Sequence, residues 1–295
     1  MPTKDLNVDI GLTTSSRWDW PDLQAFWADA EDMGFDSLWI SDHIMTEGYT
    51  TERGKPEPTA PDVPPPLIPM LECWTMLAGV APRTKNVTIG TIVSPVTFRH
   101  PSLLAKQALT LDRMTNGRLT LGLGAGYTER EHRAWGIPYP GPKQRVEMLA
   151  DQLEIMRLLE TEEHATYNGK HFSLENAPAV PKPVNGHIPI MVGGTRPMMM
   201  KLVAKYGDHY NVAGSPNFVK ERFEDLERAC DEIDRDPADL KRSVGLFIAP
   251  VDPLSSLDRA LHVIQRFHDV GCQEIIFGVR QDHRPVIDEL AKYLE

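Results

Sequence analysis

The chain has 295 residues, of which 41% are hydrophobic, and carries a formal net charge of -11. Nucleic acids and anionic membrane surfaces both reward clustered Lys and Arg, so this acidity argues against either as a partner. No apolar run reaches the roughly 18 residues that a membrane-spanning helix needs. The composition is typical of a globular protein that binds a small molecule or a second copy of itself.

Cys73, Cys230 and Cys272 are odd in number, far apart and without a CxxC pair. This spacing fits neither a disulfide framework nor a zinc site, so we expect three buried thiols. The first residues lack the basic start and apolar core of a signal peptide, which predicts a cytoplasmic protein.

The first elements are a strand, a helix and a second strand. Apolar and polar residues alternate over residues 6–12, which predicts a strand, and Pro21 then opens a helix that stops at Gly34. A short strand over residues 37–40 ends at Asp42 and His43. Parallel barrels place their chemistry at the carboxyl ends of strands, so we mark this pair as candidate site residues.

Residues 44–69 have no apolar periodicity and hold seven prolines after position 55. A proline inside a helix costs about 3 kcal/mol, so this stretch is predicted to be a loop. Loops this long within a compact domain are often lids over a site, which we favour here over a surface insertion without function.

The segment 87–127 contains a strand pattern, a polar loop, a helix ended by Asn116-Gly117, a strand over 118–123 and a glycine turn. Together these make a complete β-loop-α-β unit. Such a unit predicts a parallel sheet.

The remaining chain continues one strand-helix rhythm with a single excursion. After a long amphipathic helix, Asn168-Gly169 predicts a hairpin turn that lies outside the main sheet. Four more strand-helix pairs begin at residues 188, 210, 243 and 274. Eight strands, each followed by a helix, predict an α/β fold: one (β/α)8 TIM barrel over residues 1–295, with insertions after strands 2 and 4.

Two glycine-rich strand exits are candidate ligand sites. The turn that ends at Gly126 lacks the final glycine of a dinucleotide fingerprint, because Tyr127 stands there, and a ligand-free turn explains it equally well. Gly193, Gly194 and Thr195 precede a predicted helix, whose free amides and dipole favour a phosphate. No P-loop lysine follows, so this second site suits a phosphorylated cofactor.

The charged candidates are the Asp42-His43 pair and the run over residues 129–133. A metal needs three or four ligands and no cluster supports this pair, so we predict no metal site. A structural histidine remains an alternative to a cofactor contact. The charged run is typical of a solvated helix face, although Arg130 and Glu131 are placed to reach the cleft. No hydrolase motif is present.

Three segments closely resemble the bacterial luciferase-like family, particularly its branch of oxidoreductases that use the deazaflavin coenzyme F420. They are GFDSLWISDH, GTIVSPVTFRHPSLLAKQALTLDRMTNGRLTLGLGAGY and IPIMVGGTRPMMMKLVAKYGDHYNV, and the similarity runs over residues 6–214. The resemblance implies a barrel that holds a flavin or deazaflavin at the carboxyl ends of its strands. It also implies hydride transfer between F420 and a small organic substrate, and we expect a homodimer.

The resemblance further implies roles for individual residues. Asp42 and His43 would lie against the ring, and a non-proline cis peptide would support its back face at Ile92-Val93. The cofactor's side chain and phosphate would be contacted by a further set of residues. These are Ala125, Gly126, Gly193, Gly194 and Thr195; Arg130, from the charged run, is predicted as a further cofactor contact.

His43 is the residue expected to polarise the substrate or to handle a proton, and Glu131 is a second catalytic candidate. Some deazaflavin dehydrogenases carry a catalytic glutamate directly after the glycine turn, where this chain has Tyr127. One alternative function is an FMN-dependent two-component monooxygenase, which uses O2 and reduced flavin from a partner reductase. Another is a non-catalytic flavin-binding protein.

Overall fold

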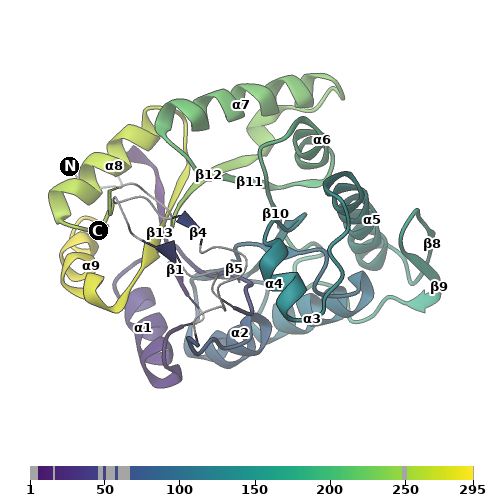
Figure 1. Ribbon diagram of the computed structural model, residues 1–295, viewed down its shortest axis with the longest axis horizontal. Coiled ribbons are helices and arrows are strands. Elements are labelled where there is room, and N and C mark those ends of the chain that lie inside the picture. Colours follow the sequence, from purple (N-terminus) through teal and green to yellow (C-terminus); the bar gives the residue numbers. More distant parts are fainter. Residues whose placement is uncertain are drawn as a thin grey trace.

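The computed structural model describes residues 6–15, 17–45, 49–50, 57–58, 67–247 and 251–294 (Figure 1). Within these ranges, eight parallel strands form a closed barrel in which β13 pairs with β1 and β7 pairs with β10. The strands are β1 (Asp9–Thr14), β2 (Ser37–Ile40), β5 (Thr88–Thr91), β7 (Leu119–Gly124), β10 (Ile190–Gly193), β11 (His209–Val212), β12 (Lys241–Leu246) and β13 (Glu274–Val279). The predicted (β/α)8 fold is confirmed.

Helices surround the barrel (Figure 1). Six of them carry a proline in the first turn, where its fixed φ and missing N–H cost nothing. The sequence thus encodes where most of these helices begin. Around the barrel lie α1 (Trp20–Asp32), α2 (Cys73–Val80), α3 (Pro101–Met114), α5 (Pro142–Thr161), α6 (Pro197–Tyr206), α7 (Pro216–Asp231), α8 (Leu257–His268) and α9 (Arg284–Ala291).

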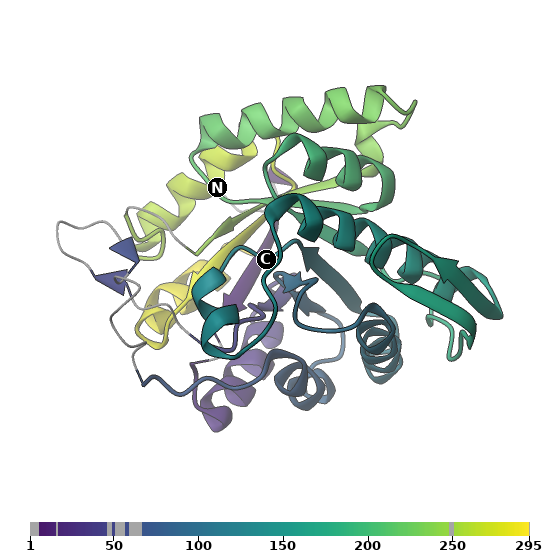
Figure 2. The ribbon, with the colours of Figure 1, turned by 45° about the vertical axis from the view of Figure 1, so that its right-hand side comes forward.

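Both predicted insertions are present. After β2, a short antiparallel pair is formed by β3 (Tyr49–Thr50) and β4 (Glu57–Pro58). Most of the predicted lid over residues 44–69 lies outside the described residues. After β7 come α4 (Glu129–Ala134), α5 and the hairpin of β8 (His164–Asn168) with β9 (Ser173–Pro178). The hairpin projects beyond α5, away from the barrel, as expected (Figures 1 and 2).

The first strand differs from its prediction. It begins at Asp9 rather than at residue 6, and it extends to Thr14. Thr13 and Thr14 are buried and pair with both neighbouring strands. Because these last two positions are polar, apolar alternation ends before the strand does.

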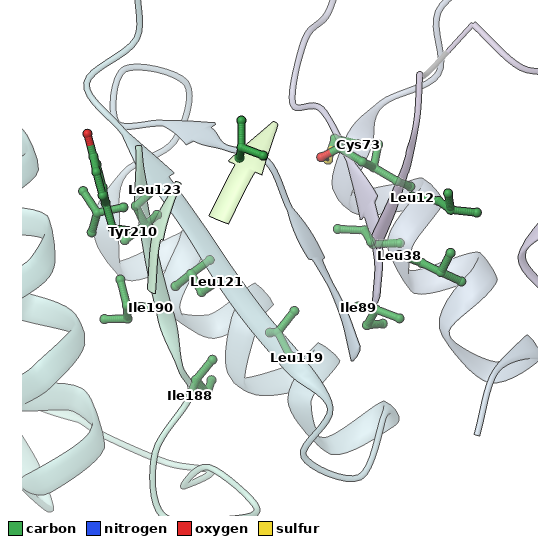
Figure 3. Packing of buried hydrophobic residues seen from close by; sticks show 14 of the residues in the cluster. Leu12, Leu38, Cys73, Ile89, Leu119, Leu121, Leu123, Ile188, Ile190 and Tyr210 are labelled. Atoms are coloured by element: carbon green, nitrogen blue, oxygen red, sulfur yellow. The ribbon is translucent and has the colours of Figure 1, made fainter. Parts of the chain in front are cut away.

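The apolar core has an outer and an inner part. The outer part lies between strands and helices and includes alternate residues of β7, namely Leu119, Leu121 and Leu123 (Figure 3). The inner part fills the barrel with Trp39, Ile92, Met191 and Ile276. All three cysteines are buried free thiols, as predicted.

Below this inner apolar layer, the amino end of the barrel holds a buried polar group. Ser37 Oγ donates to the Glu274 carboxylate, and Lys241 Nζ lies 2.8 Å from Glu274 Oε2. His209 Nε2 contacts Ser243 Oγ at 2.7 Å and lies 3.6 Å from Glu274 Oε2. Burial lowers the pKa of His209 to about 4, so its ring is neutral near pH 7. No described helix is long and apolar enough to cross a membrane.

Candidate functional site

Asp42 follows β2 and is only 2% exposed. Its Oδ2 accepts hydrogen bonds from Ser94 Oγ at 2.6 Å and from Arg99 Nη1 at 2.5 Å, and its Oδ1 accepts from Arg99 Nη2 at 3.2 Å. Arg99 also forms an ion pair with Glu72. Both Asp42 oxygens therefore accept hydrogen bonds from the segment 94–99, and the carboxylate is buried.

Arg99 is a site residue that the sequence analysis missed. It lies between β6 (Ser94–Pro95) and α3, and its side chain is 11% exposed. Burial acts to lower its pKa, but the carboxylates of Asp42 and Glu72 outweigh burial and raise it. A signal was available, because a buried carboxylate at a strand exit requires a cation or several donors.

His43 and Glu131 meet at the carboxyl end of the barrel. His43 Nδ1 lies 3.0 Å from Glu131 Oε2, and Glu131 Oε1 accepts from the backbone N–H of Met45 at 3.1 Å and from that of Ile44. Glu131 is 1% exposed, so the solvated-face interpretation is wrong for this member of the charged run. A carboxylate can only accept, so Nδ1 carries the hydrogen and Nε2 is left as an acceptor.

Tyr127 stands beside His43. Its hydroxyl oxygen is 3.5 Å from His43 Nε2, and the two rings meet edge to face with centroids 5.9 Å apart. The residue is 68% exposed. Its backbone is nevertheless fixed, because the Tyr139 hydroxyl donates to Tyr127 O at 3.0 Å and Arg145 Nε donates to Gly126 O at 3.3 Å.

His132 packs against the turn that follows β7. Its Nδ1 contacts Thr128 O at 2.8 Å and its Nε2 contacts Thr97 Oγ1 at 2.6 Å, so both ring nitrogens are used. The rings of Phe98 and Tyr139 pack on it, with centroids 5.0 and 4.8 Å away. This buried histidine belongs to the packing of the turn, which separates it from His43.

The peptide bond between Ile92 and Val93 is cis, as the resemblance implied. The Val93 side chain lies against two glycine positions on neighbouring strands. A Cβ at Gly124 would lie 2.7 Å from Val93 Cγ2, whereas a Cβ at Gly193 would lie 3.6 Å from both Val93 methyl groups. Val93 leaves no space for a Cβ at position 124, so this position requires glycine. At position 193 a Cβ would fit, although the residue is glycine.

Three further predicted cofactor contacts follow β7 in the chain. Ala125 and Gly126 are half-buried, and Gly126 has φ +77, a conformation that favours glycine. Arg130 is half-buried in the first turn of α4.

The second glycine exit differs from its prediction in one respect. The helix α6 begins at Pro197, two residues beyond Thr195, so Gly193 ends β10 while Gly194 and Thr195 lie in the loop before the helix. Gly194 O accepts from the Tyr210 hydroxyl at 2.8 Å. This bond fixes the loop between β10 and α6.

The arrangement supports proton chemistry. Among the described residues, no group of three or more His, Cys, Asp or Glu side chains could hold a metal ion. His43 is a partly exposed base whose ring is oriented by a buried carboxylate. Such a pair can take up or release a proton at Nε2.

The sequence profile described as luciferase-like monooxygenase matches residues 7–287. An F420-dependent glucose-6-phosphate dehydrogenase of Amycolatopsis mediterranei (strain U-32) is 28% identical over 240 residues, which cover 77% of this chain and 67% of that protein.

Among solved structures, an F420-dependent secondary alcohol dehydrogenase in complex with an F420-acetone adduct has a TM-score of 0.80 at 21% identity, with 98% of this chain and 99% of that chain covered. The oxygenating constituent of 3,6-diketocamphane monooxygenase from Pseudomonas putida, in complex with FMN, has a TM-score of 0.71 at 18% identity, with 96% of each chain covered. At these identities the likeness shows the fold. Because the profile spans almost the whole length, the chain belongs to the luciferase-like monooxygenase family.

Proposed function

We propose that this protein is an oxidoreductase that moves a hydride between coenzyme F420 and a small organic substrate at the carboxyl end of the barrel. The observation that carries the proposal is the His43–Glu131 pair, an oriented base at the exit of β2. The floor, by which we mean Val93 and Gly193, lies at the same carboxyl end of the barrel. A deazaflavin supplies the redox chemistry, and the protein supplies the base and the surface that binds the ring.

The residues present fit a planar cofactor. Val93 offers an apolar surface, and Gly193 leaves beside it a space that a Cβ would fill. Ala125 and Gly126 at one strand exit, with Gly194 and Thr195 at another, would contact the cofactor's side chain and phosphate. When bound, the deazaflavin supplies the chemistry of hydride transfer.

The chain's own residues would handle the proton and hold the geometry. His43 Nε2 takes a proton from the substrate or returns one to it, while Glu131 is a positioning residue that keeps the hydrogen on Nδ1. Asp42 and Arg99 join the exit of β2 to the segment before α3. Arg130 lies next to Glu131 on α4 and would serve the acidic part of the cofactor.

The named relatives support F420 as the first choice, because a dehydrogenase that is 28% identical over 240 residues carries that cofactor in its name. The second candidate is an FMN-dependent monooxygenase that uses O2 and a partner reductase. It is favoured by the FMN-bound structure with a TM-score of 0.71. F420 and FMN share a fused ring, a ribityl chain and a phosphate, so the same residues would contact either cofactor.

Binding of F420 and FMN, followed by fluorescence and absorbance, tests the cofactor directly. We expect saturable binding of F420 that is tighter than that of FMN. Tight FMN binding without detectable affinity for F420 would overturn the first choice and favour the monooxygenase.

A variant at the floor tests the location. Gly193→Leu would place a side chain beside Val93 and should weaken F420 binding by about tenfold or more through steric conflict. Gly141→Ala is the control, since a Cβ there would meet nothing within 4 Å. Thermal unfolding of both variants checks the fold. Unchanged F420 affinity in folded Gly193→Leu would contradict the proposed floor.

A further inference from the structure

We infer that Phe247 is a substrate-contacting residue, and that the substrate presents an apolar, ring-sized part to it. Phe247 comes directly after β12 and is 40% exposed. The inference deepens the proposed function and rests on it for the redox reaction. The contact itself is built only from residues of this chain.

The Phe247 ring lies on the inner face of the barrel. On β12, Val244 and Leu246 pack in the outer core between strands and helices, so the alternate residues point to the interior. Phe247 continues this alternation, because a Cβ at Gly245 would collide with its ring. Since residue 247 follows the last residue of β12, the ring lies at the carboxyl end, where the candidate site is.

Phe247 lies across the mouth of the barrel from the floor. The closed sheet runs in the order β1-β2-β5-β7-β10-β11-β12-β13 and returns to β1. Three strands separate β12 from β5 on either side, so these two strands are opposite each other. The cis bond that places Val93 in the floor follows β5. An eight-stranded barrel is only wide enough inside for its own side chains or one small ligand, so a flat ligand on Val93 turns its other face toward Phe247.

Two glycines make room for this ring. Besides the collision at Gly245, a Cβ at Gly278 on the neighbouring β13 would lie 2.9 Å from Phe247 Cα. Neither glycine has a positive φ, so the backbone alone does not require glycine at these positions. Ile276, two residues before Gly278, belongs to the inner core, so Gly278 also faces the interior. The missing side chains therefore fit Phe247, and they fix where its ring lies.

The surroundings of the ring favour an apolar partner. A single exposed apolar residue is ordinary on a protein surface, but this one lies inside the mouth of a barrel in a fixed position. Beyond the buried polar group at the amino end, the inner positions of β12 and β13 are Gly245, Ile276 and Gly278, which carry no charge. A sugar phosphate would find no charged partner on these two strands. An aromatic or alicyclic part of a substrate gains free energy by burying its face against the ring.

The test uses fluorobenzene as an apolar probe and 2-deoxy-2-fluoroglucose 6-phosphate as a polar one. Binding to the full chain, with and without F420, is followed by fluorine NMR. Phe247→Leu removes the aromatic face and keeps an apolar side chain at this position. We expect it to weaken binding of fluorobenzene about fivefold, the value of one aromatic contact. Phe172→Leu, in the hairpin outside the barrel, is the matched control and should bind like the unmodified chain.

A second readout locates the bound probe. With carbon-13 in the phenylalanine rings, and the Phe247 signals assigned from Phe247→Leu, bound fluorobenzene should give a nuclear Overhauser effect to the Phe247 ring. F420 affinity should change less than about twofold in the same variant, because the cofactor lies on the floor at the opposite side. Thermal unfolding of both leucine variants checks the fold.

Several results would overturn the inference. They are equal fluorobenzene affinity in Phe247→Leu and the unmodified chain, no saturable binding of fluorobenzene, no Overhauser effect to Phe247, and tighter binding of the sugar phosphate than of fluorobenzene. Loss of F420 affinity in Phe247→Leu with fluorobenzene binding unchanged would place the ring against the cofactor and would also overturn it. Absence of F420 binding to the unmodified chain would refute the proposed cofactor, while the titration without F420 would still decide the role of Phe247.

Discussion

The two ends of the barrel each bring a histidine close to a buried glutamate, and the two pairs differ in access. His43 and Glu131 lie at the carboxyl end with 32% and 1% of their side chains exposed. His209 and Glu274 lie at the amino end with 5% and 1% exposed. The residue types are the same, yet only one histidine can meet a ligand.

The partners of the two pairs differ as well. Glu131 hydrogen-bonds His43 directly at 3.0 Å, whereas Glu274 is paired with Lys241 at 2.8 Å and His209 remains 3.6 Å away. Desolvation keeps His209 neutral, with its pKa lowered to about 4. We infer that the amino-end group stabilises the barrel and that the carboxyl-end pair serves the chemistry.

The largest effect should follow from removing the amino-end carboxylate. Glu274→Ala removes a carboxylate that is 1% exposed and that bonds both Ser37 and Lys241, and should cost about 3 kcal/mol of unfolding free energy. Among the described residues, Lys241 then keeps Asp9 as a partner. Denaturant unfolding measures the loss. Glu232→Ala removes an exposed partner of Lys201 and should cost under about 1 kcal/mol. Equal losses in both variants would contradict the assigned role.

The same residue gives a pH dependence. Burial acts to raise the pKa of Glu274, but its charged partners outweigh burial and lower it from the usual 4.5. A lowered folded-state pKa means that this stability is present above about pH 4.5 and is lost as the pH falls through the folded-state value. Acid unfolding of Glu274→Ala should accordingly depend less on pH than that of the unmodified chain.

The next effect concerns the support of the carboxyl end. Arg99→Met leaves the buried Asp42 carboxylate with Ser94 as its remaining described partner, and should cost about 2 kcal/mol of unfolding free energy. Adding Asp42→Asn should recover part of the loss, because the uncompensated charge is gone. Thermal unfolding of the single and double variants checks this. A double variant less stable than Arg99→Met would speak against the ion pair.

Glu131→Gln should lower the unfolding free energy less than the variants above, but it should change the tautomer of His43 clearly. The amide no longer holds the hydrogen of His43 on Nδ1 as strongly, so nitrogen NMR should show more of the other tautomer. Turnover with F420 should fall about tenfold or more, because a ring that carries its hydrogen on Nε2 cannot accept a proton there. Glu129→Gln, exposed on the same helix, is the control. An unchanged tautomer would remove Glu131 from the positioning role.

The smallest effect lies at the surface. His187 contacts Asp208 Oδ2 at 2.8 Å and Glu160 Oε2 at 2.7 Å, and these hydrogen bonds raise its pKa to about 10. A raised pKa means that its stabilisation is full below about pH 6.5 and is lost as the pH rises toward 10. Because His187 is about half exposed, we expect less than about 1 kcal/mol. Melting temperatures of His187→Gln and the unmodified chain should converge at high pH; a constant difference would contradict this.

Much of the scaffold was predictable from the sequence. Prolines in the first turns, glycines at the helix ends and the strand-helix rhythm led to the eight-stranded barrel and to the hairpin outside it. The cis bond at Ile92-Val93 followed from the resemblance and is confirmed. The roles of His43 and Glu131 remain proposals, although the structure brings the two side chains together.

The unpredicted features are contacts between segments distant in sequence. Arg99 reaches Asp42 across 57 positions, and Ser37 reaches Glu274 across 237. Periodicity reports which face of an element is buried and does not report which polar partner it meets. The strand that leads into the glycine turn shows the same limit, because the absent side chains of Gly122 and Gly124 make room for Thr91 and Val93.

The central claim is that His43, and not His209, belongs to the functional site. Nitrogen NMR of histidine-labelled protein can follow both rings in one titration with F420, after assignment by His43→Gln and His209→Gln. We predict that the His43 ring resonances shift with saturation while those of His209 stay unchanged. Saturable F420 binding that leaves His43 unchanged, or that shifts only His209, would contradict the account.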